Sequence, residues 1–162
     1  MIPFAQAIDT FLIRLSRQAL EALDGLPPDD LNEWRPRPDL TDINTFYALA
    51  THIVGSGEYW VVHAAGGRPV ERDRPAEFRA RGDLATLAAR YERWLSDSRQ
   101  ILAGLTETDL TRVFARNADP AQGLTEIRWT VAECLVHAVE HIAAHVGHLQ
   151  IQRQLWNAER RA

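Results

Sequence analysis

Apolar residues recur at spacings of three and four along the chain, which is the pattern of helices that bury one face. The first stretch predicts a helix from Phe4 to Leu26, and Pro27-Pro28 ends it because proline breaks a helix. A second helix of about 23 residues opens near Thr41-Asp42, where either side chain can cap it, and ends at Gly66-Gly67. The buried face predicted for the first helix consists of Phe4, Ile8, Phe11, Leu12, Leu15, Ala19 and Leu23.

Two more helices are predicted in the second half of the chain. One runs from about Asp83 to Gly104, with its apolar residues on one side. The other has the clearest start, because Thr130 and Glu133 fit a capping box in which each side chain satisfies an exposed backbone amide. This last helix is expected to end near Asn157.

Three long connections join these helices. The first is too rich in proline for regular structure, and residues 68–82 mix charges and prolines as a solvated connection does. In residues 106–129, Asn117, Pro120 and Gly123 favour turns, with or without a short extended pair, over another helix. No stretch alternates at the period of a strand over a useful length. The predicted fold class is therefore all-α, a four-helix bundle whose long connections are candidates for the walls of a site.

Length and composition restrict the class of protein further. A chain of 162 residues, 46% apolar and 25% charged, is expected to form one globular domain over residues 1–162. A net charge of −4 weighs against a nucleic-acid partner. The single cysteine, Cys134, cannot form an intrachain disulfide and suits a reducing compartment, so a cytoplasmic location is expected. Neither a secretory signal nor an apolar run long enough to span a membrane is seen, so no membrane partner is expected.

Four of the six histidines lie in the last predicted helix, at His137, His141, His145 and His148. They fall within about 80° of the helical wheel, beside the aliphatic face. A single histidine on a helix is more often a surface or interface residue, but four in register favour metal binding. Two imidazoles four residues apart point the same way at about 6 Å along the axis, which allows both to reach one cation.

A third ligand is expected from the second helix, which carries His52 and His63. The choice between them depends on the packing direction. If the second and fourth helices are antiparallel with their ends level, His52 and the midpoint of His141 and His145 both lie about 13 residues from those ends. The trio His52, His141 and His145 then matches best. Three imidazoles leave coordination positions open, as in catalytic centres, and suit zinc or nickel better than calcium or magnesium.

Cys134 falls on the wheel among these histidines. It is either a fourth ligand or nucleophile, or an inert core residue, which is the usual role of an isolated cysteine. On the second helix, Ser56 and Tyr59 share the broad face of His52 and could bond a substrate, although Tyr59 equally suits the core. The roles of His63, His137 and His148 stay open.

The residues of the last helix also resemble those of a known family. The segment from His137 to Gln150, with Trp129-Thr130-Val131 before it, is similar to the last helix of the DinB-like superfamily. Leu26 to Asn32 and His52-Ile53-Val54-Gly55 resemble the first connection and second helix of that superfamily. The similarity covers nearly the whole chain, and the ending from His145 to Gln150 is closest to the branch of mycothiol-dependent transferases.

This resemblance implies an up-down-down-up bundle, in which the second and fourth helices are antiparallel. It implies a divalent metal held by His52, His141 and His145, with a low-molecular-weight thiol as co-substrate and a homodimer as the assembly. One departure is Val146, which stands where the family often has an arginine.

Three functions are consistent with these residues. The first is a metal-dependent enzyme that acts on a small-molecule substrate, either a thiol-dependent S-transferase or a hydrolase, in which the cation activates a thiol or water. The second is a small-molecule-binding or stress-response module without turnover. The third is a metal-free structural dimer with the histidine stripe at the subunit contact. Among the arginines of residues 68–82, one or two could orient a carboxylate if this connection covers the metal.

Overall fold

The computed structural model describes residues 1–37, 39–40 and 42–161, and these residues are mostly helical. The long helical segments are α1 (Pro3–Leu23), α3 (Phe46–Gly57) with its π-helical continuation η1 (Glu58–Ala65), α5 (Leu84–Gly104) and α6 (Val131–Glu159). The short elements are α2 (Pro28–Glu33), α4 (Arg74–Glu77), the 3₁₀ turns η2 (Asp109–Thr111) and η3 (Pro120–Gln122), and the antiparallel strands β1 (Val113–Arg116) and β2 (Ile127–Thr130). Within the described residues, none of the helices has the length and apolarity that crossing a membrane requires.

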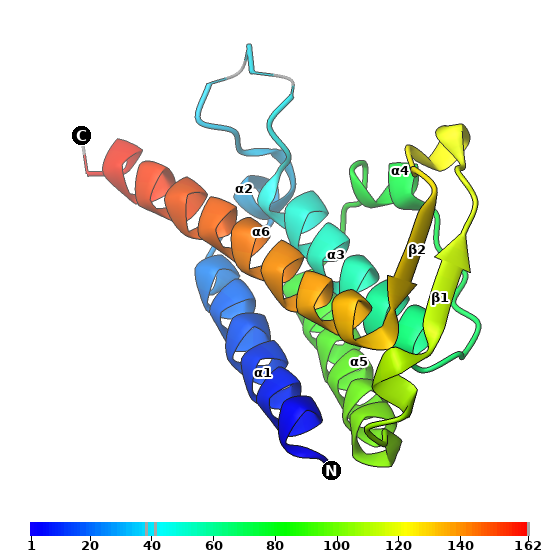
Figure 1. The fold of residues 1–162 in the computed structure, drawn as a ribbon. Coiled ribbons are helices and arrows are strands. Elements are labelled where there is room, and N and C mark those ends of the chain that lie inside the picture. The colour runs from blue at the N-terminus through cyan, green and yellow to red at the C-terminus, as the bar shows by residue number, and fades with distance from the viewer. Residues whose placement is uncertain (38, 41, 162) are drawn as a thin grey trace.

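Helix α3 and its continuation η1 run antiparallel to α6 (Figure 1). At the beginning of α3, the Gln152 amide donates a hydrogen bond of 2.7 Å to the carbonyl of Asn44. At the other end, the ring of Trp60 packs against His137 with centroids 4.7 Å apart. Residues early in α3 therefore meet residues late in α6, and the two segments align over most of their length.

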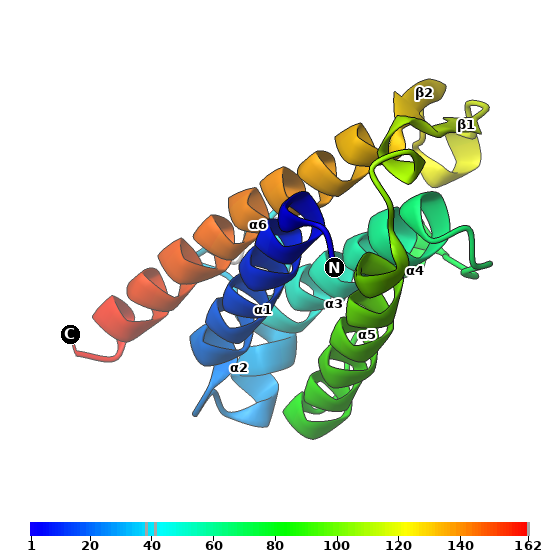
Figure 2. The same cartoon turned by 60° about the horizontal axis from the view of Figure 1, so that its bottom comes forward.

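Helix α1 lies between α5 and α6 (Figure 2). Helix α1 runs antiparallel to α5, because an ion pair of 3.1 Å between Asp9 and Arg99 joins the start of α1 to the end of α5. Helix α5 runs in the same direction as α3, because the Tyr91 hydroxyl reaches the carbonyl of Ala50 while Trp94 packs at Gly57. A Cβ at Gly57 would lie 2.2 Å from the Trp94 ring, so glycine is what allows this close packing.

Helix α3 is the central element of the fold. Every residue from Phe46 to Gly57 is buried, because α1, α2, α4, α5 and α6 all contact this helix. A helix that is apolar all round is expected at the centre of a core. The ionisable His52 is an exception on it, and a buried polar group needs partners to offset its desolvation.

The predicted starts of the third and fourth long helices are confirmed. Thr130 and Glu133 form the expected capping box, with bonds of 3.2 Å and 2.7 Å to each other's backbone amide. Asp83 caps α5 through the amide of Thr86.

The first helix ends at Leu23 instead of Leu26. Phe11, placed on its buried face by periodicity, is 40% exposed, because the apolar stripe is narrower than predicted.

The second helix begins later than predicted. Asp42 does not cap it, since the helix starts at Phe46 and the Thr45 hydroxyl accepts the bond from the Ala48 amide. Thr41, the other expected cap, lies outside the described residues. The sequence also gives no sign that the hydrogen bonding changes to π-helical after Gly57.

The connections contain more structure than predicted. The first includes α2, whose Pro28 occupies the opening turn, where proline removes no needed hydrogen bond. Residues 68–82 include α4 and are not merely solvated, because Glu77 in them is buried. The third connection has two 3₁₀ turns and the short extended pair that the turn residues allowed, paired from Val113 with Thr130 to Arg116 with Ile127.

Candidate metal centre

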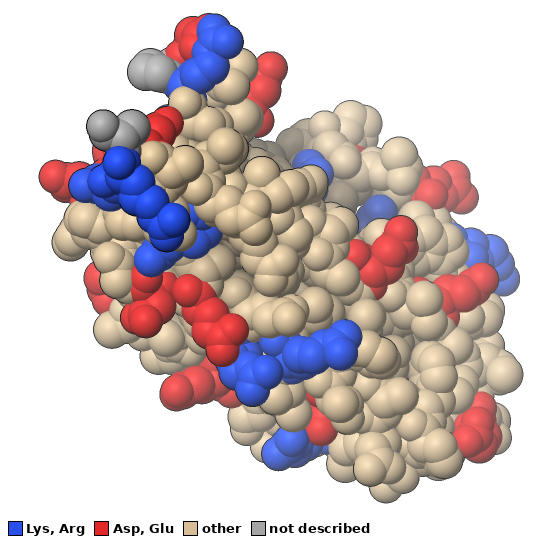
Figure 3. Space-filling model, turned by 90° about the vertical axis from the view of Figure 1, so that its left-hand side faces the viewer, with Lys and Arg blue, Asp and Glu red and all other residues tan. Residues whose placement is uncertain are grey.

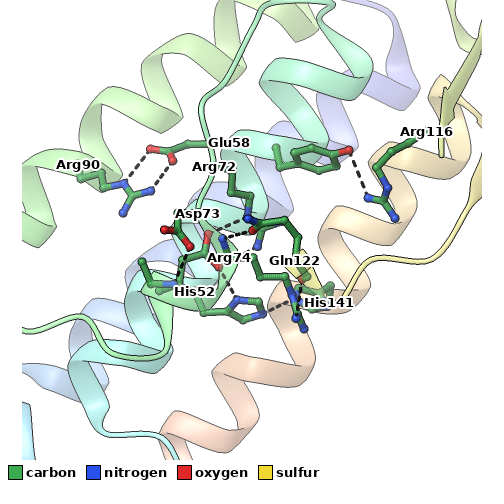
Figure 4. Close-up of polar contacts among 12 residues, drawn as sticks. His52, Glu58, Arg72, Asp73, Arg74, Arg90, Arg116, Gln122 and His141 are labelled. Carbon is green, nitrogen blue, oxygen red and sulfur yellow. Dashed lines mark hydrogen bonds and ion pairs between the residues drawn. The ribbon is translucent and has the colours of Figure 1, made fainter. Parts of the chain in front are cut away.

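Three histidines converge between α3 and α6. Figure 4 shows two of them, His52 and His141, pointing towards each other. His52 projects from the central helix and is 2% exposed, while His141 and His145 are half-buried on α6. One nitrogen of each ring lies within 4.8 Å of the other two, so the three could hold one metal ion. The Nε2 atoms of His52 and His141 are 3.0 Å apart, and the rings of His141 and His145 have centroids 4.5 Å apart. The structure thus brings together the trio that helix depth selected.

A buried carboxylate forms a hydrogen bond with His52 through the ring nitrogen that does not face His141. Oε2 of Glu77 lies 2.8 Å from His52 Nδ1, and the Glu77 side chain is 6% exposed. Arg72 donates two hydrogen bonds of 2.7 Å and 2.9 Å to the same carboxylate. Because a carboxylate accepts, Nδ1 is the donor of this hydrogen bond, and Nε2 is the ring nitrogen that faces the gap between the histidines. Histidines that bind metals commonly have such an outer carboxylate.

The local sequence explains how Glu77 reaches the core. Asp73 caps α4 by accepting a bond of 2.9 Å from the amide of Ala76, and Pro75 presets its first turn. On the receiving side, α3 has Gly55, where an added Cβ would lie 2.2 Å from Glu77 Oε1. The absence of a side chain at Gly55 therefore makes the room for the carboxylate.

Burial sets the protonation states of this centre. Burial, together with the neighbouring His145 and His52, lowers the pKa of His141 to about 3. Burial, His52, His148 and Arg74 lower the pKa of His145 to about 4. For Glu77, burial alone would raise the pKa, but the hydrogen bonds from His52 and Arg72 prevail and lower it. At neutral pH, His141 and His145 are therefore neutral, as metal ligands must be, and Glu77 is ionised.

The remaining histidines lie outside this trio. His137 packs between Trp60 and Trp129, with ring centroids 4.7 Å and 4.9 Å away. His63 has Nδ1 3.1 Å from the carbonyl of Arg68, near the end of η1. His148 is exposed, and its Nδ1 lies 3.3 Å from that of His145. Register on one helical face therefore does not by itself bring an imidazole into the cluster.

Other candidate groups have structural environments. Cys134 is fully buried, and this burial raises the pKa of its thiol to about 11, which suits an inert core residue. Tyr59 is buried, and its hydroxyl accepts a bond of 3.2 Å from Arg116. Ser56 is also buried in α3, 1% exposed.

A pocket of about 390 Å³ adjoins the histidine cluster. His145 and His148 form one end of it, and α6 continues along it with Ile151 and Leu155. The connection before α3 closes the opposite side with Pro36, Asp42, Ile43 and Asn44. Figure 3 views the molecule from the side of the C-terminus and shows a largely uncharged middle below this projecting connection. A mainly apolar small molecule could therefore lie next to His145.

Glu77 is a candidate functional residue that the sequence patterns did not identify. Its carboxylate belongs to a connection that reads as a mixed-charge loop, and its partner His52 is 25 residues away. The available signal was local: Asp73 followed by Pro75 is typical of a helix start, which would have placed Glu77 on a helix.

Three imidazoles from antiparallel helical segments converge beside a buried carboxylate. The fold and the site therefore define a helical protein with a candidate metal centre. The family model of mycothiol-S-transferase matches residues 7–158, so the chain belongs to this DinB-like family, as the resemblance predicted.

A solved structure shares the fold. The crystal structure of the conserved protein of a locus from Enterococcus faecalis aligns with a TM-score of 0.68 at 18% sequence identity. The alignment covers 96% of this chain and 98% of that chain. Among curated proteins, no sequence matches this chain.

Proposed function

We propose that the protein is a divalent-metal-dependent S-transferase that uses a low-molecular-weight thiol, with the metal held by His52, His141 and His145. The observation that carries the proposal is the approach of their donor nitrogens to within 4.8 Å of one another. The family name supports a thiol as co-substrate. When bound, a divalent ion at this place supplies Lewis-acid activation of a thiol or of water at neutral pH.

The chain's own residues prepare this site before any ligand arrives. Glu77 accepts a hydrogen bond of 2.8 Å from His52 Nδ1 and so holds His52 Nε2 towards His141. Arg72 fixes the carboxylate through two hydrogen bonds, which keeps the ring orientation constant. A donor set of three imidazoles without a thiolate favours zinc or nickel, and it leaves coordination positions for a thiol.

The pocket beside His145 is the proposed place for the second, electrophilic substrate. Its apolar side chains, among them Leu49 and Ile151, can exclude water from the reacting sulfur. Water in place of the thiol would make the same centre a hydrolase, and binding without turnover would make it a binding module.

Several properties of the whole protein belong to the same proposal. The four long segments are proposed to form the DinB-like up-down-down-up bundle within one domain over residues 1–162. The opposite directions of α3 and α6, and the common direction of α3 and α5, support this topology. A homodimer in the cytoplasm is proposed from the family resemblance and from the single cysteine, Cys134.

A transfer assay tests the proposed activity. Zinc-loaded and nickel-loaded protein would be incubated with mycothiol and the electrophile monobromobimane, and the thioether adduct would be quantified by mass spectrometry against the uncatalysed rate. We expect catalysed adduct formation that His145→Ala abolishes and His63→Ala leaves unchanged. Rates equal to the uncatalysed reaction with both metals, or full activity of His145→Ala, would contradict the proposal.

A further inference from the structure

Arg74 places a positive charge beside the histidine cluster without a carboxylate partner. Its neighbours are paired: Arg72 with Glu77 at 2.7 Å, and Arg90 with Glu58 at 2.6 Å. In the part of the chain that the structure describes, no carboxylate oxygen lies within 4.0 Å of an Arg74 nitrogen. Since Glu77 and Arg72 balance each other, the charge of Arg74 is left uncompensated at this place.

Two connections hold the Arg74 side chain in position. The backbone amide of Arg74 donates a bond of 2.8 Å to Gln122 Oε1, and Nη1 donates one of 3.3 Å to the Gln122 carbonyl. At Gly123, an added Cβ would lie 2.9 Å from Nη1. The turn η3 therefore leaves room for the guanidinium and fixes one of its edges.

The guanidinium of Arg74 lies over the ring of Phe78, which contacts the candidate ligand His52. Its central carbon lies 5.2 Å from the ring centroid of Phe78, and the Phe78 ring lies 4.6 Å from that of His52. In Figure 4 the Arg74 side chain extends towards His141, and its charge is close enough to act on His145. Arg74 is thus attached to the same cluster from the side of α4.

One edge of the guanidinium remains available. Nη1 bonds Gln122, whereas Nε and Nη2 have no hydrogen-bond partner among residues 1–37, 39–40 and 42–161. These two nitrogens point their hydrogens in parallel, which is the geometry that binds both oxygens of a carboxylate. The side chain is half-buried, so an anion bound there would be partly shielded from water.

We propose that Arg74 binds a carboxylate of the electrophilic substrate that reacts with the thiol at the histidine cluster, so the preferred electrophile is a carboxylic acid. This inference rests on the proposed function, because it assigns the substrate class of the same site. It gives residues 68–82 a role in selecting the substrate, while Arg72 in that connection positions Glu77.

The first experiment tests Arg74 in the metal-free protein, so its outcome does not depend on the proposed activity. The Nε–Hε resonances of ¹⁵N-labelled protein would be followed while propionate, or uncharged 1-propanol of matched chain length, is added. Loss of one resonance in Arg74→Lys assigns the signal. We expect a saturable shift of the Arg74 signal with propionate alone. No shift, or an equal shift with 1-propanol, would overturn the proposal.

The second experiment measures selection at the loaded centre. Zinc-loaded protein would be incubated with mycothiol and with either iodoacetate or uncharged iodoacetamide, and kcat/KM for each electrophile would be measured from the thioether adduct. We expect the preference for iodoacetate to be about tenfold beyond the ratio of the uncatalysed rates, as a charge-assisted hydrogen bond predicts. Arg74→Gln should remove this preference and Arg74→Lys should keep part of it.

The matched control is Arg79→Gln, which removes the same charge from an exposed position in the same connection. It should retain the full preference, and thermal unfolding of each variant checks that the fold is intact. Equal preference in Arg74→Gln and wild type would overturn the carboxylate site. Absence of catalysed transfer to both electrophiles would contradict the proposed function instead, and the propionate titration would still decide the role of Arg74.

Discussion

Segments α3–η1 and α6 place histidines at two levels, and the two levels differ in their surroundings. At the level of α4, His52, His141 and His145 surround a small space beside the buried carboxylate of Glu77. One to two turns nearer the start of α6, His137 is enclosed by the rings of Trp60 and Trp129. The first level has converging ring nitrogens, whereas the second has a packed aromatic cluster.

The two levels differ in the side chains that the connections place beside them, because the same two helical segments carry both levels. The connection through α4 brings Glu77, which orients an imidazole. Strands β1 and β2 bring Phe114 and Trp129, which stack around Trp60 and fill the space that a ligand would need. A histidine stripe therefore becomes a candidate metal site only where an outer polar partner arrives.

The largest expected effect is the loss of zinc affinity when a histidine of the first level is replaced, compared with no loss for His137 at the second level. His141→Ala should lower zinc affinity by more than the roughly 100-fold typical of losing an outer partner, because it removes a direct ligand. His137→Ala should leave affinity and stoichiometry unchanged. Competition with a fluorescent zinc chelator measures both. Comparable losses in the two variants would make the two levels equivalent and contradict the assignment.

The aromatic level should instead control stability. Trp60 is 6% exposed and stacks on Trp129, so Trp60→Ala should lower the free energy of unfolding by about 3 kcal/mol or more. Urea denaturation of the metal-free protein measures this change, with the exposed Val136→Ala as a control of small effect. Zinc affinity at low temperature should stay near the wild-type value; a large loss there would show that the levels are coupled.

A weaker effect is expected from the outer carboxylate. Glu77→Gln keeps the size of the side chain but removes the charge that orients His52, so zinc affinity should fall about 10-fold to 100-fold. Glu140→Gln, on the exposed face of α6, is the control and should bind zinc normally. Wild-type affinity in Glu77→Gln would show that the carboxylate does not support the centre.

The smallest effect concerns pH. The lowered pKa values of His141 (about 3) and His145 (about 4) mean that the unfolded chain takes up protons below about pH 6.5 that the folded chain excludes. The stability of the metal-free protein should therefore fall as the pH decreases from about 6.5 towards 4. Thermal unfolding against pH measures the slope, which should be shallower in the double variant His141→Gln, His145→Gln. An unchanged slope would refute this origin, and His137→Gln should retain the wild-type slope.

Features that depend on neighbouring residues could be predicted from the sequence. The start of α6 follows from Thr130 and Glu133, and the common direction of His141 and His145 follows from helical spacing. These features are set by backbone geometry and side-chain hydrogen bonds within a few turns. The choice of His52 as the third member also required the antiparallel packing that the family resemblance implied.

Features that depend on tertiary packing could not be predicted. The burial of Glu77 requires Gly55 on another helix to leave room for it, and no pattern within residues 68–82 carries that information. The enclosure of His137 likewise depends on the pairing of β1 with β2, which places Trp129 over it. In both cases the deciding partner lies on an element packed from elsewhere.

One divalent ion is expected to bind at His52, His141 and His145 and to remain open to a further ligand. X-ray absorption spectroscopy of protein loaded with one equivalent of zinc tests it most directly. We expect three imidazole nitrogens at about 2.0–2.1 Å from the zinc, with a further light-atom ligand that an added thiol replaces with sulfur. A spectrum without histidine scattering, or one unchanged in His52→Ala, would contradict it.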